Sequence, residues 1–391
     1  MKFVSAVTTE VEFEDALKSL IQQTASKAGD ASLDLMVVFA SAHFTHSIRE
    51  IVQDLLAALK PGLLIGCTAE AVVSRDREIE KGPAITLVAA QMPEAGLHHF
   101  LLQPDSLDWP KLLLDEDEFH RRVGAPEDTR LFMLLGDPFS APMDDLLQAF
   151  NQYFPGIPVV GGIASAALRP GGNTLFVNDT VTSQGVVGVA FSGALDIDVV
   201  VSQGCRPIWR PYKVVEARRN EIYNLEGRAP LAWLQDLIPT LSEEDKSLLQ
   251  TGLFVGRSVK PGQELLGRGD FVIRGVMSID QQSGAIAIGD SVMDGDMIQF
   301  HLRDAMTALE DLEMQLIPQM FRDAACGGLL FTCNGRGTHL YERPNGDINI
   351  IQPSIKNVPL AGFFCAGEIG PIGKMNFLHG HTATLVLFRP A

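Results

Sequence analysis

The sequence has few of the features that mark secreted or membrane-spanning proteins. Its five cysteines are odd in number and widely spaced over 391 residues, which is typical of reduced thiols and not of a disulfide framework. No apolar run approaches the ~18 residues that a membrane-spanning helix needs. The first residues hold one lysine and a short apolar stretch before acidic residues, so we expect no secretory signal. These absences predict a soluble, cytoplasmic protein.

Positive charge is also scarce. The chain has 31 Lys and Arg against 48 Asp and Glu, a net charge of −17. Nucleic acids and anionic membranes are bound through basic patches, so we expect neither as a partner. Residues 326–391 are the exception, because five Lys or Arg and three Asp or Glu give them a net charge of +2. This favours a small anionic or zwitterionic ligand near the C-terminus.

The length predicts more than one domain. A single core seldom grows beyond ~250–300 residues, and the composition, 46% apolar and 20% charged, is that of a globular protein with a sizeable core. The character of the sequence changes around residues 226–230. We therefore expect an α/β domain with an internal repeat over residues 1–226, and a second α/β domain, which carries the candidate site, over residues 227–391.

A strand–helix–strand pattern recurs along the chain. Short apolar runs, too short for a lone buried helix, alternate with amphipathic segments that end at a Pro-Gly pair. Such repeats pack as layered α/β structure with mixed sheets, so we expect this fold class in two packed parts. In the third copy we expect Pro353 to interrupt the helix. The strands of the three copies, some with the turn or glycines that follow them, are predicted within residues 33–40 and 63–73, 130–140 and 157–168, and 327–337 and 358–368.

The segment CNGRG, residues 333–337, follows an expected buried strand. Asn and Gly accept positive φ angles, so Asn334 and its neighbours could turn backbone N–H groups toward an anion. Arg336 could hold a carboxylate or phosphate with two parallel hydrogen bonds. The same residues would also suit an ordinary turn with Arg336 in water. The segment matches no phosphate-loop or dinucleotide-binding motif.

A second glycine-rich segment, GEIGPIGKMNF, follows the next expected strand. We expect it to be a turn that presents Glu368, whose carboxylate could pair with a ligand ammonium or act as an acid or base. Lys374 could hold an anion and Asn376 could donate or accept a hydrogen bond. Lys374 is equally well explained as a solvated charge in an exposed loop.

Two histidines and a cysteine complete the candidate set. His379 and His381 are two residues apart, so in a strand they would share one face. With Glu368, Cys333 or His339 they could bind a metal, but no typical metal-binding spacing is present, and we expect histidines that orient a ligand or serve the structure, and no metal. Cys333 could be a nucleophile with either histidine as its base, although free cysteines are more often buried hydrophobic residues.

These motifs resemble those of the FIST family, a two-part sensory module of bacterial signalling proteins and some eukaryotic F-box proteins. The resemblance begins near residue 30. It implies a FIST N-terminal-like domain and a FIST C-terminal-like domain, and a cytoplasmic role in binding small ligands such as amino acids. No kinase, cyclase, chemotaxis or F-box segment accompanies the motifs, so we expect the output to pass through a separate chain. The motifs are IGCTAEAV, PVVGGIAS and NTLFVND in the first half, and CNGRG, VPLAGFFCAGEIGPIG and NFLHGHTATLVLF in the second.

We therefore predict a small-ligand sensor for amino acids or similar anionic or zwitterionic metabolites. It would need no cofactor, and it would act through a separate signalling protein of the kinase, cyclase or chemotaxis type. One alternative is an enzyme acting on a small metabolite with Cys333 or Glu368 as the reacting group and the histidines as proton carriers. Another is a structural module that binds protein. The predicted ligand-binding residues are Asn334, Arg336, Glu368, Lys374, Asn376, His379 and His381, with Cys333 as the candidate nucleophile.

Overall fold

The computed structural model describes residues 1–259, 266–267 and 269–391, which form two compact units. The first comprises Met1–Val201, Leu312–Leu378 and Thr382–Ala391, and the second comprises Ser202–Asp311 and His379–His381. Both contain helices and mixed or antiparallel sheets, so the predicted α/β class is confirmed. None of the helices in these described ranges has the length and apolar character needed to cross a bilayer.

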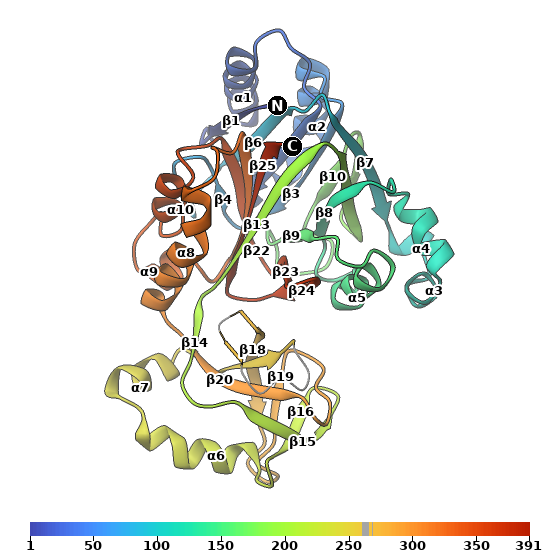
Figure 1. The fold of residues 1–391 in the computed structure, drawn as a ribbon. Coiled ribbons are helices and arrows are strands. Elements are labelled where there is room, and N and C mark those ends of the chain that lie inside the picture. Colours follow the sequence, from blue (N-terminus) through green and yellow to red (C-terminus); the bar gives the residue numbers. More distant parts are fainter. Residues whose placement is uncertain (260–265, 268) are drawn as a thin grey trace. The chain divides into compact units, whose positions relative to one another are not determined.

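The first unit contains three six-stranded sheets (Figure 1). At the centre of each lie two parallel strands joined by a helix-containing crossover, as the repeated sequence pattern predicts: β2 with β3, β8 with β9, and β21 with β22. In order, the first sheet is β1 (Lys2–Thr8), β6 (Ile85–Gln91), β2 (Leu35–Ser41), β3 (Leu63–Ala69), β10 (Leu175–Val177) and β11 (Thr180–Thr182). The second is β24 (Met375–His379), β23 (Glu368–Ile372), β9 (Val159–Ile163), β8 (Thr129–Gly136), β12 (Val186–Gly193) and β7 (Ala95–Leu102). The third is β13 (Leu195–Gln203), β25 (Thr382–Pro390), β21 (Gly327–Cys333), β22 (Leu360–Cys365), β4 (Val72–Val73) and β5 (Glu78–Ile79).

Each repeat donates a hairpin to another repeat's sheet. The β4–β5 hairpin of the first repeat joins β22 of the third, β10–β11 of the second joins β3 of the first, and β23–β24 of the third joins β9 of the second. The exchange is cyclic, so the three repeats interlock. The inward faces of the sheets share one core, in which Phe39, Phe331 and Phe363 pack with ring centroids 4.7–6.2 Å apart.

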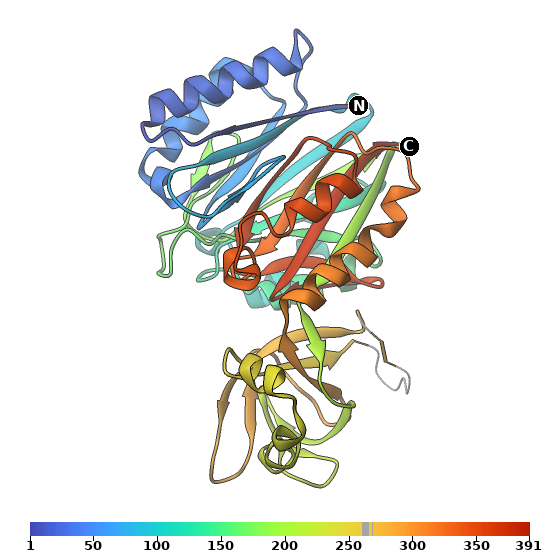
Figure 2. The ribbon, with the colours of Figure 1, turned by 90° about the vertical axis from the view of Figure 1, so that its left-hand side faces the viewer.

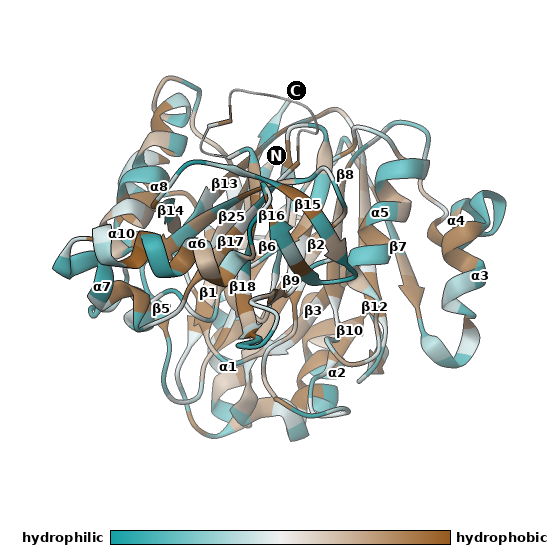
Figure 3. Ribbon diagram, turned by 90° about the horizontal axis from the view of Figure 1, so that it is seen from below, coloured by the Kyte–Doolittle hydropathy of each residue, from teal (hydrophilic) through white to brown (hydrophobic). Residues whose placement is uncertain are grey.

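Helices cover the outward face of each sheet. Their apolar residues pack on the sheets. In Figure 3 the ribbon of helices such as α4 and α5 alternates between brown (apolar) and teal (polar) segments. Figure 2 shows α8 and α10, orange and red, over the third sheet. The helices are α1 (Phe13–Ala28) and α2 (Ile48–Leu59) on the first sheet, α3 (Trp109–Leu114), α4 (Glu116–Val123) and α5 (Met143–Tyr153) on the second, and α8 (Ala305–Met320) and α10 (Ile348–Ser354) on the third. Shorter helical turns are η1 (Ala42–Ser47), η2 (Pro104–Ser106) and α9 (Thr338–Tyr341).

One expectation about these helices is wrong. Pro353 lies inside α10 instead of interrupting it. It is the sixth of seven residues, so the backbone hydrogen bond that it removes is the one to the carbonyl of Asn349. Asn349 is exposed, and its carbonyl can be solvated. The apolar residues Ile348 and Ile351 meanwhile bury the other face of the helix.

The second unit is built around one antiparallel sheet that closes on itself, because its last strand also pairs with its second. The core contains Tyr212, Ile286, Ile298 and Phe300. The strands are, in order, β14 (Cys205–Pro207), β20 (Met297–Arg303), β15 (Tyr212–Arg218), β16 (Glu221–Leu225), β19 (Ile286–Ile288), β18 (Phe271–Ile279) and β17 (Phe254–Ser258). The helical segments are α6 (Pro230–Leu237), η3 (Ile238–Thr240) and α7 (Glu243–Leu249).

Candidate functional site

In the first unit, strand ends from all three repeats meet. The Glu70 N–H, just after β3, donates to Ser165 Oγ at 2.9 Å, and Ser165 lies just after β9. The Ser165 hydroxyl in turn donates to the carbonyl of Phe364 in β22. The Ala366 N–H donates to the carbonyl of Ile163 at 3.0 Å. Loops at the carboxyl ends of parallel strands are where α/β folds commonly bind ligands, and here three such ends converge.

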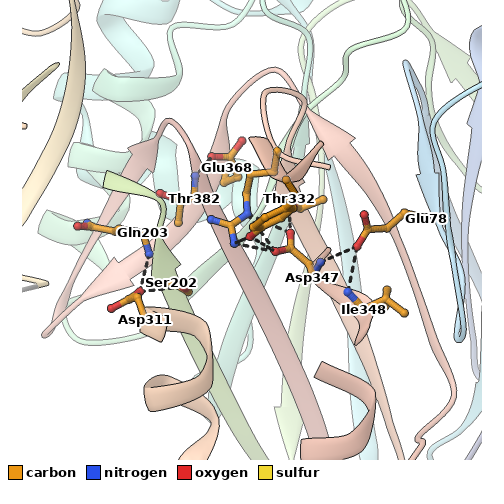
Figure 4. A network of polar contacts seen from close by, with 11 residues as sticks. Glu78, Ser202, Gln203, Asp311, Thr332, Asp347, Ile348, Glu368 and Thr382 are labelled. Carbon is orange, nitrogen blue, oxygen red and sulfur yellow. Dashed lines mark hydrogen bonds and ion pairs between the residues drawn. The ribbon is translucent and has the colours of Figure 1, made fainter. Parts of the chain in front are cut away.

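The CNGRG segment ends in a buried ion pair. Arg336 is fully buried, and its Nε and Nη2 donate to the two carboxylate oxygens of Asp347 at 3.0 and 2.7 Å. Asp347 also accepts hydrogen bonds from the Tyr341 hydroxyl at 2.7 Å and the Thr332 hydroxyl at 2.8 Å. Figure 4 shows Thr332 and Asp347 within this network. The carboxylate is therefore saturated by donors.

The charges in this pair support each other. Burial alone would lower the pKa of Arg336, but the facing Asp347 carboxylate raises that pKa above its ordinary value. Burial alone would raise the pKa of Asp347, but the Arg336 cation and its hydrogen bonds hold that pKa below its usual range. Both side chains are thus ionised at neutral pH. Removing either one would leave an uncompensated buried charge.

Glu78 of β5 joins the same network from the first repeat. Its Oε1 accepts hydrogen bonds from the backbone N–H groups of Asp347 and Ile348, both at 2.9 Å, at the start of α10 (Figure 4). Burial, followed by repulsion from the Asp347 carboxylate, raises the pKa of Glu78 to about 8. Glu78 is therefore mostly protonated at pH 7.

Glu368 is the second buried acid of the site. It is fully buried, and its Oε2 accepts a hydrogen bond from the Thr382 N–H at 3.1 Å (Figure 4). Its Oε1 is also buried and accepts no hydrogen bond from any residue in the described ranges. Burial raises the pKa of Glu368 to about 8, although the Thr382 N–H, the Arg336 cation and the Cys333 side chain act to lower it.

Two thiols, those of Cys333 and Cys365, interact with this acid, and a third, that of Cys67, interacts with Cys365. Cys333, Cys365 and Cys67 are all buried and reduced. Burial raises the pKa of Cys365 well above its ordinary value, and the charge of Glu368 raises it further. Burial likewise raises the pKa of Cys67. Cys333 differs in its surroundings, because the Gly335 N–H points at its Sγ at 3.4 Å.

The accessible part of the site lies above these buried groups. Asn334 and Gly335 are partly exposed, while Glu70 and Ala366 are exposed. The Asn334 side-chain amide donates to Glu70 Oε2 at 3.3 Å, and its backbone N–H donates to the carbonyl of Cys365 at 2.9 Å. The site therefore has a polar rim from the first and third repeats, and its buried acid belongs to the third repeat as well.

Two of the predicted residues lie at the far end of the β23–β24 hairpin. Lys374 is exposed in the turn between the two strands. Asn376 is buried, and its amide donates to the Ile157 carbonyl at 3.0 Å and accepts from the Val159 N–H at 2.7 Å. Its backbone N–H also donates to the Asn151 side chain at 2.7 Å. Asn376 thus ties the hairpin to the second repeat.

Two local expectations about these segments are wrong. Glu368 begins strand β23 and does not lie in a turn, because its backbone pairs with Gly162 of β9 in another repeat. His379 and His381 do not share one face of a strand. His379 ends β24, and His381 has a φ of 60°, which turns the chain. Both histidines fall in the second unit, where the His381 ring lies 4.6 Å from that of Phe254.

Several residues of the network escaped the sequence reasoning. Asp347, Tyr341 and Glu78 lie in no motif, and Glu70 lies in IGCTAEAV without having been singled out; Glu70 and Glu78 belong to the first repeat. One signal was available for Asp347. It is one of only three acidic residues after position 325, and it lies in a segment otherwise rich in apolar residues. Among the described residues, no group of three or more His, Cys, Asp or Glu is arranged to hold a metal ion.

Comparison with known proteins gives two domain matches. The FIST N domain matches residues 34–228, and the FIST C domain matches residues 230–371. These segments and the two compact units divide the chain differently, because the C-terminal strands of the FIST C segment complete the sheets of the first unit.

Three curated relatives illustrate the range of sequence identity and coverage. An uncharacterized protein of Mycobacterium bovis is 37% identical over 388 residues, which is 98% of each chain. An uncharacterized protein of Mycobacterium tuberculosis is 37% identical over 360 residues, 90% of this chain and 91% of that protein. An F-box/LRR-repeat protein of Arabidopsis thaliana is 27% identical over 202 residues, 49% of this chain and 37% of that protein.

Among solved structures, a crystal structure of cyanuric acid hydrolase from A. caulinodans aligns over 98% of this chain and 99% of that chain. The TM-score is 0.37 and the sequence identity is 7%. A likeness of this size supports no inference about this chain.

Proposed function

The chain belongs to the FIST family, whose domains are sensory, and from this premise we propose that it senses a small zwitterionic metabolite. The ligand would bind at the converging strand ends of the first unit, over Glu368. An amino acid or a close derivative fits this chemistry. The signal would pass, in the cytoplasm, to a separate signalling protein.

The observation that carries the proposal is the unsatisfied oxygen of Glu368. A buried polar atom without a hydrogen bond costs about 1–3 kcal/mol, and most buried polar atoms in folded proteins are paired. Oε1 of Glu368 is buried and accepts no hydrogen bond from the described residues. A ligand ammonium would supply the missing donor and would favour the ionised form of the carboxyl.

The surroundings suit the other end of a zwitterion. Arg336 is close enough to lower the pKa of Glu368, so the same positive field would attract a ligand carboxylate. The guanidinium is already engaged by Asp347 and Tyr341. We therefore propose that Arg336 attracts the ligand carboxylate electrostatically without contacting it. The partly exposed side-chain amide of Asn334 would contact the carboxylate directly. Lys374, at the tip of the hairpin, would contribute least.

A second candidate function is favoured by the neighbourhood of Cys333. Its Sγ receives the Gly335 N–H, which would stabilise a thiolate, and Glu368 interacts with the same side chain. An acid whose pKa is about 8 could exchange a proton with a nearby thiol at neutral pH. In this alternative the site would catalyse a reaction of the bound metabolite. Fast alkylation of Cys333 at pH 7 would favour catalysis, and slow alkylation would exclude the thiolate nucleophile.

The proposal is tested by thermal shift of the purified chain against single amino acids, organic acids and nucleotides. A ligand at a hundredfold excess over its Kd stabilises the folded state by about 2.7 kcal/mol. We expect an amino acid to raise the Tm of the wild type and of Lys374→Ala, and to have no effect on Glu368→Gln. An equal shift in Glu368→Gln would refute the site. Absence of any amino-acid shift would refute the ligand class.

A further inference from the structure

The outer face of α8 carries an exposed apolar stripe. The side chains of Met314, Ile317, Met320 and Phe321 are 48%, 50%, 57% and 84% exposed. They recur at intervals of three and four residues, so they lie on one side of the helix. The opposite side, with Leu312 and Leu316, is buried against the third sheet. Large side chains scattered singly on a surface need no explanation, but a contiguous group marks an interaction site.

The charges beside the stripe are acidic. Glu310 and Glu313 are exposed on the same helix, and Asp323 follows Phe321. Two arginines lie nearby and both are paired: Arg322 forms ion pairs with Asp196 and Asp198. The buried Arg389, which donates to Gln319 of α8 at 2.8 Å, also pairs with Asp198. Lys356 adds one positive charge, and its Nζ donates to the carbonyl of Arg322 at 3.1 Å.

From this stripe and its charges we propose that α8 is the docking surface for a basic amphipathic helix of a partner protein. An apolar face of such a helix would cover Met314, Ile317 and Phe321, and its Lys or Arg residues would meet Glu310, Glu313 and Asp323. Methionine side chains are flexible and polarisable, and surfaces that accept helices use them often. A second copy of this chain is the poorer occupant, because each copy carries a net charge of −17.

The docking surface is independent of the ligand proposal, since none of its residues belongs to the site around Glu368. It is also a place where the expected separate signalling protein could bind. α8 carries the chain from the second compact unit into the first. A partner on its outer face would therefore hold a helix shared by both units.

The test uses the full chain and a labelled synthetic probe. The probe is an 18-residue peptide of Leu and Lys whose leucines share one helix face, and its control has the same composition with the leucines scattered. Ile317→Glu removes an apolar contact while adding negative charge, so it separates apolar docking from charge attraction. Leu168→Glu is the matched control, because Leu168 is 94% exposed in the loop between β9 and β10 and receives the same charge.

Fluorescence anisotropy should show the patterned peptide binding the wild type and Leu168→Glu at least tenfold more tightly than the scattered peptide. Ile317→Glu should lose that preference, and Glu313→Gln should weaken binding of the patterned peptide several-fold. Equal binding of the two peptides to the wild type would overturn the proposal. So would unchanged preference in Ile317→Glu, or light scattering that shows the wild type, but not Ile317→Glu, to be a dimer.

Discussion

Arg336 and Glu368 belong to the same repeat and are both fully buried, yet they are satisfied to different degrees. Arg336 faces an ionised partner, Asp347, whose two carboxylate oxygens accept hydrogen bonds from its Nε and Nη2. Glu368 has one oxygen paired with a backbone N–H and one oxygen that accepts no hydrogen bond from the described residues. The difference separates two roles. A saturated buried charge holds the loop in place, whereas an unsaturated acid is available to a ligand.

The largest effect should come from breaking the saturated pair. Asp347→Ala leaves the Arg336 charge buried without its partner, so we expect the free energy of unfolding to fall by about 3–5 kcal/mol. Urea denaturation measures this. The double variant Arg336→Met, Asp347→Leu removes both charges and should lose much less. Glu243→Gln, which breaks the exposed pair with Lys246, should change stability by less than about 0.5 kcal/mol.

The second effect concerns pH. The folded-state pKa values of Glu78 and Glu368 are raised from 4.5 to about 8. Between those values the folded state holds protons that the unfolded state has released, so stability is highest at low pH within this window and is lost as pH rises toward 8. Each such proton contributes a slope of about 1.4 kcal/mol per pH unit.

The variant Glu368→Gln should remove one of these slopes, and Glu78→Gln the other. Urea denaturation at pH 5, 6, 7 and 8 measures them. If the free energy of unfolding of the wild type rises from pH 5 to 8, and Glu368→Gln shows the same slope, then Glu368 is ionised in the folded protein. Glu368 would then be a buried ionised group like Arg336, and the contrast between the two residues would be lost.

The smallest effect is expected at Lys374. Its side chain is exposed at the tip of the β23–β24 hairpin, so Lys374→Ala should change stability by less than about 0.5 kcal/mol. Ligand-induced shifts of Tm should also persist in this variant. Loss of those shifts would place the ligand carboxylate at the hairpin tip. The site would then include Lys374 in addition to the surroundings of Arg336 and Glu368.

The fold was predictable where it depends on local pattern. Apolar runs and their spacing, with Pro-Gly stops in the first two copies, predict three strand–helix–strand units, and in the structure each unit forms a parallel strand pair. The hairpins exchanged between repeats were not predictable. Pairing of β23 with β9 joins residues some two hundred positions apart and leaves no short-range pattern. For the same reason Glu368 was expected in a turn.

The candidate site was predictable as a location and not as a set of contacts. The glycine-rich segments pointed to Cys333, Arg336 and Glu368, which the fold brings into mutual electrostatic reach. The partner of Arg336, Asp347, lies just before a short helix, and Glu78, which binds the start of that helix, lies on a two-residue strand. Neither element has a motif, so only the folded arrangement shows which charges are paired.

The most direct test of the ligand site is a pH titration of Glu368. Carbon NMR of protein labelled at the glutamate carboxyl monitors the titration, and the Glu368→Gln variant assigns the signal. We expect a pKa of about 8 in the free protein. With the amino acid that gives the largest thermal shift, the pKa should fall, because the ligand ammonium favours the ionised carboxyl. A free-protein pKa near 4.5, or a pKa that the bound amino acid leaves unchanged, would contradict a ligand held by Glu368.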